Sequence, residues 1–276
     1  MRTIVHVSDL HFGRVDPQVV AGLTRSVEAL RPDVIAVSGD LTQRARPREF
    51  LAARAFLQTL PAPKVIVPGN HDIPLYDVVS RFVSPLARYR RYIGSDVEPS
   101  FVDDEIVVVG VNTARSLTFK GGRINVEQMR RARALFCRMD DVHVRIVVTH
   151  HPFHLEDADA VDLVGRGSMA LSHWRACLPD ILLAGHMHTH ATGTTAQRYD
   201  LGGKSAIVVQ AGTATSTRGR GESNSFNVLN VSPRSVAIRR FDWQSTVGAF
   251  AVTDERRYAR PGNAWEVEER TRDDDA

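Results

Sequence analysis

Cysteines and long apolar runs are both scarce in this sequence. Only two cysteines occur, Cys137 and Cys177, too few for the disulfide framework of a small secreted domain. Both lie in helix-like stretches, which favours buried free thiols in a reducing compartment. No apolar run approaches the roughly 20 residues that span a bilayer, and the N-terminus lacks an apolar stretch with a small-residue cleavage site. We therefore expect a cytoplasmic protein with no membrane span.

Concentrated charge is lacking as well. The 276 residues include 35 Lys and Arg against 32 Asp and Glu, a formal net charge of +3, and the two signs are interspersed along the chain. Without a basic stripe or a coiled-coil insertion, we expect no nucleic acid partner. A homodimer is compatible with this composition. The 43% hydrophobic and 24% charged residues are typical of a globular domain.

Short apolar runs alternate with amphipathic stretches along most of the chain. This rhythm is typical of strands alternating with helices, and uninterrupted apolar strands predict sheets covered by helices. The expected strands are 4–7, 34–37, 65–67, 106–111, 146–148, 181–184, 206–209, 226–231 and 235–241. The expected helices are 17–30, 47–60 and 126–139. The fold class is therefore α/β.

Three segments depart from this rhythm. Residues 76–93 indicate one or two surface helices, and residues 151–172 indicate a long loop that leads into a helix. Long loops beside a site often determine substrate choice. We expect a catalytic domain over residues 1–245 and a C-terminal extension over residues 246–276, which is polar, ends in Asp273-Asp274-Asp275 and is expected to be partly disordered.

Polar side chains follow five of the predicted strands. Each lies within about three residues of a strand end, and such ends gather at one edge of an α/β sheet. The five residues are Asp9, Asp40, Asn70, His150 and His186. Two histidines extend the set, because His11 and His188 lie two positions after Asp9 and His186, a spacing that in a strand directs both side chains to one side.

The donors of this set are imidazole nitrogens and carboxylate or amide oxygens. This mixture favours Mn, Fe, Zn or Co over Mg or Ca. Seven donors exceed the needs of one ion, so we expect two divalent ions, with Asp40 able to bridge them. Gly39, Gly69 and Gly185 each precede a ligand and allow close backbone approach. Such a site attracts phosphate and makes water nucleophilic near neutral pH, which predicts phosphoester hydrolysis by a metal-bridged hydroxide.

These blocks resemble a known signature. The motifs Asp9-x-His11, Gly39-Asp40, Gly69-Asn70-His71-Asp72, His150 and Gly185-His186-Met187-His188 occur in the order found in the calcineurin-like metallophosphoesterase superfamily. The resemblance implies a four-layer α/β/β/α sandwich with two mixed sheets and the metal site at the C-terminal ends of the strands.

The resemblance also implies roles for the residues. Asp9, His11, Asp40 and His188 would hold one ion, and Asp40, Asn70, His150 and His186 the other. His71 would be catalytic, contacting the substrate phosphate or the leaving oxygen as hydrogen-bond donor or general acid. Asp72 would orient His71.

The sequence around the motifs is most similar to class III cyclic nucleotide phosphodiesterases and related glycerophosphodiesterases. This implies a small phosphodiester substrate, with a 3′,5′-cyclic nucleotide such as cyclic AMP first and a glycerophosphodiester second. A pyrophosphatase acting on a lipid-linked UDP-sugar is a third hypothesis, which requires an exposed apolar patch, most plausibly within residues 76–93. A non-catalytic metal-binding scaffold is the hypothesis of a different class.

Some assignments have alternatives. Either His150 or His151 could face the metal, although the resemblance favours His150. Arg218, Arg220 and Arg115 are candidate substrate-binding residues, because a guanidinium group can bind phosphate through two hydrogen bonds. The alternative for Arg218 and Arg220 is a solvated Gly- and Ser-rich loop.

Overall fold

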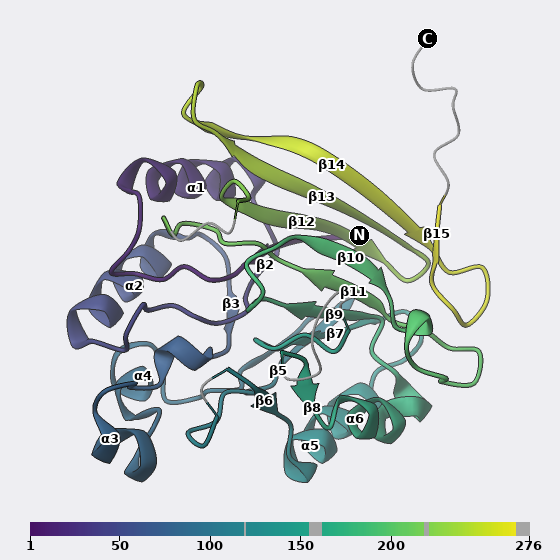
Figure 1. Ribbon diagram of the computed structural model, residues 1–276. Helices are drawn as coiled ribbons and strands as arrows, with labels where there is room; N and C mark the ends of the chain where they lie inside the picture. The colour runs from purple at the N-terminus through teal and green to yellow at the C-terminus, as the bar shows by residue number, and fades with distance from the viewer. Residues whose placement is uncertain (119, 155–161, 218–220, 269–276) are drawn as a thin grey trace.

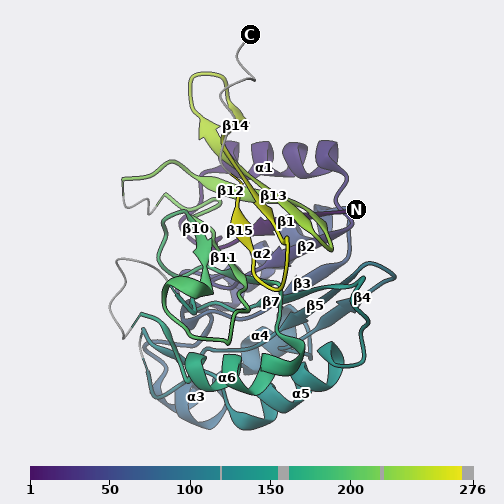
Figure 2. The same ribbon diagram turned by 90° about the vertical axis from the view of Figure 1, so that its right-hand side faces the viewer.

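The computed structural model describes residues 1–118, 120–154, 162–217 and 221–268. These residues form four layers, with two sheets packed face to face and helices on the outer face of each sheet (Figure 1). Turned by 90°, the molecule shows α1 at one end and α5 and α6 at the other, with both sheets between them (Figure 2). The predicted α/β/β/α architecture is confirmed.

The first sheet has seven strands in the order β15-β14-β13-β12-β1-β2-β3. Strands β1, β2 and β3 are parallel, and the other pairs are antiparallel. Its strands are β1 (Arg2–Val7), β2 (Val34–Val37), β3 (Lys64–Ile66), β12 (Ser225–Ser232), β13 (Ser235–Gln244), β14 (Ala249–Ala259) and β15 (Glu266–Val267). Helices α1 (Pro17–Leu30) and α2 (Pro47–Thr59) pack on its outer face.

The second sheet has six strands in the order β10-β11-β9-β7-β5-β4. Its strands are β4 (Ser100–Val102), β5 (Ile106–Gly110), β7 (Val144–Val148), β9 (Ile181–Ala184), β10 (Ala191–Thr194) and β11 (Ile207–Gln210). Helices α5 (Val126–Phe136) and α6 (Gly167–Trp174) cover its outer face. The short elements are β6 (Gly122–Arg123), β8 (Val164–Gly165), α3 (Val78–Val83), α4 (Ala87–Tyr92) and the 3-10 helices η1 (Asn70–Asp72), η2 (Arg175–Cys177) and η3 (Thr195–Gln197).

The core between the sheets explains the apolar runs of the sequence. Ile4 and Val65 of the first sheet and Val108 and Ile146 of the second sheet are buried in one cluster. Strands β2, β5, β7 and β9 are buried along their whole length, as expected for strands covered on both faces. Among the described residues, no helix is long and apolar enough to cross a membrane.

The C-terminal boundary differs from the expected one. The division at residue 245 falls at the turn between β13 and β14, and β14 pairs with β13 over most of its length. Tyr258 and Trp265 are buried in the core between the sheets. Residues 249–267 therefore contribute to the domain, where the sequence predicted a polar extension. The remaining part of that prediction, residues 269–276, lies outside the described residues.

The two cysteines also differ from the prediction of free thiols. Cys137, which follows α5, and Cys177, in η2, form a disulfide with a sequence separation of 40. Helices α5 and α6 pack side by side on the second sheet, which brings the ends of both elements together. Helical periodicity around each cysteine could not reveal this proximity.

Candidate metal centre

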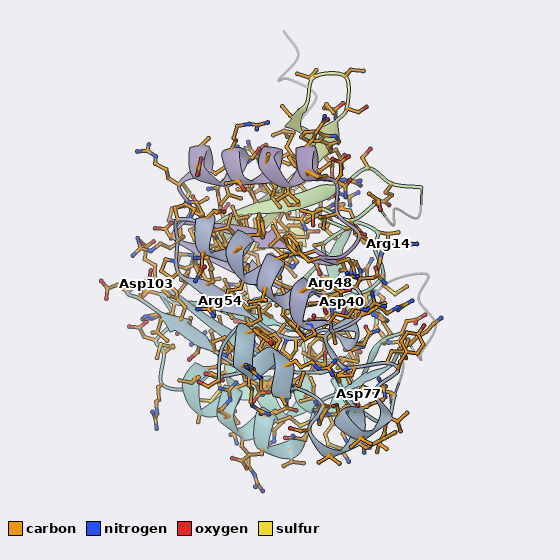
Figure 3. The ribbon with its side chains drawn as sticks, turned by 90° about the vertical axis from the view of Figure 1, so that its left-hand side faces the viewer. Arg14, Asp40, Arg48, Arg54, Asp77 and Asp103 are labelled. Atoms are coloured by element: carbon orange, nitrogen blue, oxygen red, sulfur yellow. A yellow bond between two sulfur atoms is a disulfide. The ribbon has the colours of Figure 1, made fainter. Side chains whose placement is uncertain are left out.

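The strand ends of both sheets deliver the predicted ligands to one place. Asp9 and Asp40 follow β1 and β2 of the first sheet, and His150 and His186 follow β7 and β9 of the second sheet. Asn70 opens η1 after β3. Asp40 is labelled in Figure 3, on the same side of the molecule as Arg14 and Arg48. The expectation that the ligands meet at the C-terminal ends of the strands agrees with this placement.

The local backbone at these positions is left-handed, not extended. The φ angles are 52° at Asp9, 48° at His11, 53° at Asp40, 78° at His186 and 63° at His188. The side chains of Asp9 and His11, and those of His186 and His188, are therefore not aligned by the strand alternation that the sequence predicts. Tight turns beyond the strand ends align them. Each such non-glycine conformation costs on the order of 1–3 kcal/mol, and such conformations cluster at functional sites.

One group of candidate ligands consists of Asp9, His11, Asp40 and His188. Their ligand atoms lie within 4.8 Å of one another, and all four residues are buried. The carboxylate oxygen Oδ1 of Asp9 lies 3.2 Å from Nε2 of His188 and 3.5 Å from Nε2 of His11. The other oxygen of Asp9 accepts hydrogen bonds from the Ser8 hydroxyl and from the backbone N–H of His186. One oxygen is thus anchored while the other faces the imidazoles.

A second group lies on the other side of Asp40. Nε2 of His150 is 2.9 Å from Oδ1 of Asn70 and 3.4 Å from Oδ1 of Asp40, and the rings of His150 and His186 are 5.1 Å apart. Oδ2 of Asp40 instead lies 3.8 Å from Nε2 of His11, in the first group. The two oxygens of Asp40 therefore face different donor groups, as a bridging carboxylate does.

The ambiguity between His150 and His151 can be argued from their hydrogen bonds. Nδ1 of His150 lies 2.8 Å from the carbonyl of Ser38, so Nδ1 carries the proton and Nε2 keeps its lone pair for a metal. His151 lies within ligand distance of His150 and His186, but its Nδ1 pairs with the Thr113 hydroxyl and its Nε2 with the Lys120 carbonyl. This arrangement favours His150.

The donor set fits divalent cations. Oδ1 of Asp9 and Oδ2 of Asp40 are buried and accept no hydrogen bond in the described part of the chain, although buried carboxylate oxygens normally have a partner. With the proton of His150 on Nδ1, Nε2 of His150 and Oδ1 of Asn70, 2.9 Å apart, both offer lone pairs to a cation placed between them. Six imidazole, carboxylate and amide side chains thus present lone pairs toward two points around Asp40.

Electrostatics keep the ligands in their binding forms. Burial opposes ionisation of Asp9, but the imidazoles of His188, His11 and His150 hold the pKa of this carboxyl well below its ordinary value. Neighbouring imidazoles likewise lower the pKa of Asp40 against the effect of burial. Burial and the nearby His150 lower the pKa of His186 to about 3. The ionised forms of Asp9 and Asp40 and the neutral form of His186 are the forms that bind metals.

His71 lies beside the first group, and its ring is held by the backbone. Nδ1 of His71 lies 2.9 Å from the carbonyl of Gln43, which assigns the proton to Nδ1 and directs Nε2 away from this anchor. The His71 and His11 rings meet edge to face at 4.9 Å, and the backbone N–H of His71 donates to Oδ1 of Asp40. The position suits a group that contacts substrate beside the ions.

Asp72 does not orient His71 as expected. Its buried carboxylate accepts hydrogen bonds from the backbone N–H groups of Leu41, Thr42 and Gly69 and from the Thr42 hydroxyl. Burial and the charge of Asp40 raise the pKa of Asp72 to about 6 despite these bonds. Asp72 therefore joins the loop after β2 to the loop after β3, and the residue that orients His71 is Gln43.

The glycines before the ligands meet the close contacts that the sequence predicted. A Cβ atom at Gly69 would lie 2.1 Å from Oδ1 of Asp40, and one at Gly185 would lie 1.7 Å from the Ser8 hydroxyl oxygen. Gly39 has a φ angle of 94°, and a Cβ there would lie 2.7 Å from Nδ1 of His150. A larger residue at any of the three would displace a ligand or its anchor.

Of the candidate substrate arginines, the structure describes only Arg115, whose hydrogen bonds tie it to the surrounding chain. The Arg115 guanidinium donates to the carbonyls of Asn112 and Ala114 and to the side chain of Gln128, which gives it a structural role in place of a phosphate contact. Arg218 and Arg220 lie outside the described residues. Sequence reasoning also missed Asp162, whose carboxylate lies 3.8 Å from Nε2 of His186, because no motif surrounds it.

Comparison with known families agrees with this geometry. The profile of the family described as calcineurin-like phosphoesterase matches residues 2–190, a range that includes every proposed ligand. The chain belongs to this family. A purple acid phosphatase from yellow lupin seeds shares its fold, with a TM-score of 0.69 and 13% sequence identity over 93% of this chain and 53% of that chain.

Two curated relatives match a shorter stretch. Over 82 residues the chain is 39% identical to the glycerophosphodiester phosphodiesterase GpdQ of Enterobacter lignolyticus (strain SCF1), which covers 25% of this chain and 29% of that protein. Over 82 residues it is 29% identical to a "probable cyclic nucleotide phosphodiesterase" of Synechococcus sp., covering 26% of this chain and 32% of that protein. The matched stretch is thus a minor part of each relative.

Proposed function

We propose that the protein is a dinuclear metal-dependent phosphodiesterase that hydrolyses a small nucleotide phosphodiester. The observation that carries this proposal is the orientation of Asp40, whose Oδ2 lies 3.8 Å from His11 and whose Oδ1 lies 3.4 Å from His150. A carboxylate that divides its oxygens between two donor groups is the arrangement that two adjacent ions require.

The residues around Asp40 would bind two ions in two groups. Asp9, His11 and His188 would hold one ion with Asp40, and Asn70, His150 and His186 the other. When bound, the ions supply the positive charge that makes water nucleophilic near neutral pH and stabilises charge on phosphorus-bound oxygens. The mixed nitrogen and oxygen donors favour Mn, Fe, Zn or Co.

His71 has the role of substrate-contacting acid or hydrogen-bond donor. With Nδ1 committed to the Gln43 carbonyl, Nε2 donates a proton to the leaving oxygen in the imidazolium form and accepts one in the neutral form. Ser38 and Gln43 assist only through carbonyl groups that fix the orientation of His150 and His71. No side chain of the protein has to act as nucleophile in this arrangement.

A 3′,5′-cyclic nucleotide such as cyclic AMP is our first substrate hypothesis. The similarity to a "probable cyclic nucleotide phosphodiesterase" supports it. Glycerophosphodiesters are the second hypothesis, supported by the similarity to GpdQ at higher identity. Both substrates carry one negative charge on a small phosphodiester, so the same metal centre serves either, and the residues beyond it determine the choice.

A substrate panel with parallel metal analysis tests the proposal. The panel contains cyclic AMP, cyclic GMP, a glycerophosphodiester, a lipid-linked UDP-sugar and single-stranded DNA, each assayed with Mn and compared by kcat/KM. We expect two transition ions per chain and the highest kcat/KM for a cyclic nucleotide. Fewer than one ion per chain would contradict the dinuclear centre. Two ions with no hydrolysis of any substrate would favour the non-catalytic scaffold.

A further inference from the structure

Helix α3 exposes its apolar side to solvent, whereas an ordinary surface helix packs that side on the core. Its apolar side chains face solvent, with exposed fractions of 60% for Val78, 72% for Val79, 54% for Phe82 and 79% for Val83. Positions four apart lie on the same side of a helix, so the pairs 78/82 and 79/83 form one continuous strip. Tyr76, 74% exposed just before the helix, extends it. We call these five residues the α3 face.

The opposite side of α3 is polar and buried. Arg81 is only 3% exposed, and its guanidinium donates to the carbonyls of Pro74 and Thr118. A buried guanidinium is costly unless its N–H groups have such partners. The helix therefore cannot turn its apolar residues inward without leaving that charge unpaired, and the α3 face is exposed as a fixed feature of the fold.

The α3 face adjoins the loop that orients His71. Tyr76 follows His71 by five residues, and the guanidinium of Arg44 lies over the Tyr76 ring, 5.9 Å from its centre. Arg44 is next to Gln43, whose carbonyl orients His71. In Figure 3, Asp77 at the start of α3 is labelled on the same side of the molecule as Asp40 and Arg48. A surface that contacts the α3 face thus lies beside the loop whose Gln43 carbonyl orients His71.

Three arginines lie in the segment next to this surface, where Arg44 contacts Tyr76 and Arg88 joins the Ala45 carbonyl to the Asp77 carboxylate. Arg44 is half-buried, Arg46 and Arg48 are exposed, and within the described residues none of the three forms an ion pair. The one acidic residue of their segment, Glu49, is 4% exposed and accepts from the backbone N–H groups of Arg44 and Arg46. We call Arg44, Arg46 and Arg48 the arginine rim. Its charge is not neutralised locally.

We propose that the α3 face and the arginine rim dock the protein on a lipid bilayer that contains anionic phospholipids. Exposed valine and aromatic side chains insert at the boundary between head groups and acyl chains, while guanidinium groups bind lipid phosphates. A second copy of the chain fits less well, because a two-fold contact through α3 would bring two arginine rims together. Asp77, at the start of α3, is already bonded to Ser80 and Arg88.

Co-sedimentation with vesicles tests this proposal without using activity. The full-length protein is mixed with vesicles of phosphatidylcholine alone and of phosphatidylcholine with phosphatidylglycerol. We expect binding to the mixed vesicles that weakens with salt. Val79→Ser with Phe82→Ser should weaken it about tenfold, since each exchange removes apolar area from the interface. Arg46→Glu with Arg48→Glu should abolish the preference for phosphatidylglycerol.

A matched control uses Val142→Ser with Val247→Ser, two valines that are 57% and 76% exposed elsewhere on the surface; it should bind as the unchanged protein does. Equal binding by the α3 variant, or no binding by the unchanged protein, would overturn the proposal. A dimer that is detected by light scattering and is lost in the α3 variant would also overturn the proposal, because it would identify a second copy of the chain as the partner of the α3 face. Hydrolysis of a soluble phosphodiester, measured on the same samples, reports on the proposed function separately.

Discussion

Nε2 of His11 and Nε2 of His188 face one another at 3.3 Å, although 177 positions separate the two residues in the chain. Oδ1 of Asp9 lies 3.2 Å from the second of these nitrogens. Two neutral imidazole nitrogens cannot both present lone pairs at this distance without a proton or a cation between them. A proton on one of the two nitrogens, or a cation between them, therefore joins this pair.

Metal removal should destabilise the protein, because a cation that binds only the folded chain stabilises that state. Chelation leaves the Asp9, His11 and His188 group without its cation, so we expect a lower Tm in chelator and recovery when Mn or Zn is added. At free metal about 100-fold above Kd, the gain is about 2.7 kcal/mol. Differential scanning fluorimetry across a metal titration measures it. A Tm that is independent of metal would contradict binding at this group.

Gly69→Ala should remove metal binding. The added Cβ would lie 2.1 Å from Oδ1 of Asp40, so the bridging carboxylate must move. We expect fewer bound ions and loss of at least about two orders of magnitude in kcat, because reacting groups misplaced by about 1 Å lose that much. Gly262→Ala is the matched control, since nothing lies within 4 Å of its Cβ position. Normal metal content in the Gly69 variant would argue against the proposed role of Asp40.

His71→Ala should separate metal binding from catalysis. The imidazole is anchored by the Gln43 carbonyl and lies beside the ligand His11. We expect unchanged metal content and a kcat lowered by about 10²–10⁴, the usual contribution of a positioned acid or base. A substrate with a better leaving group should lose less. Full activity in this variant would refute the role, whereas loss of metal would make His71 a ligand.

His6 should make stability depend on pH. Burial and the neighbouring His190 lower the pKa of His6 from 6.5 to about 3, so between these values the unfolded chain binds more protons. This contribution of His6 to the free energy of unfolding is fully present above pH 6.5 and falls by about 1.4 kcal/mol per pH unit as the pH is lowered. Between pH 7 and pH 5, the free energy of unfolding measured in urea should therefore fall by about 2 kcal/mol less in metal-free His6→Asn than in the metal-free unchanged protein. Parallel pH profiles would contradict the assignment.

The disulfide should contribute measurably to stability. Cys137 and Cys177 are 40 positions apart, and closing a loop of that length reduces the entropy of the unfolded chain by about 4 kcal/mol in free-energy terms. Reductant should therefore lower the free energy of unfolding by about that amount. Cys137→Ser should resemble the reduced protein and show no response to reductant. An identical denaturation midpoint with and without reductant would exclude a structural disulfide.

The central part of the fold could be predicted because burial on both faces leaves a clear trace. Runs such as 34–37 and 106–110 are continuously apolar, and only covered strands tolerate that. Strand β14 has no such trace, because one of its faces is exposed and carries charged residues. The position of β14 in the sheet depends on its pairing with β13, and this pairing depends on the residues of both strands.

The convergence of the candidate ligands could be predicted because each follows the end of a predicted strand, where the ends of an α/β sheet gather. Their anchors could not, since His150 and His71 are held by the carbonyls of Ser38 and Gln43, and every residue has a carbonyl group. The sequence predicts that Asp72 orients the adjacent His71, but the Asp72 carboxylate accepts hydrogen bonds from the loop about 30 positions earlier. Such contacts follow from the tertiary fold alone.

The buried guanidinium of Arg81 has a further consequence for how this protein can diverge. Its carbonyl partners fix the orientation of α3 from within, while Val79 and Val83 contribute little to the core that they face away from. Substitutions on the outward side are therefore nearly neutral for folding. The outward residues of α3 can change during evolution while the residues of the metal centre stay the same. The free energy of unfolding should therefore change little when the four apolar positions around Arg81 are changed, whatever surface they meet.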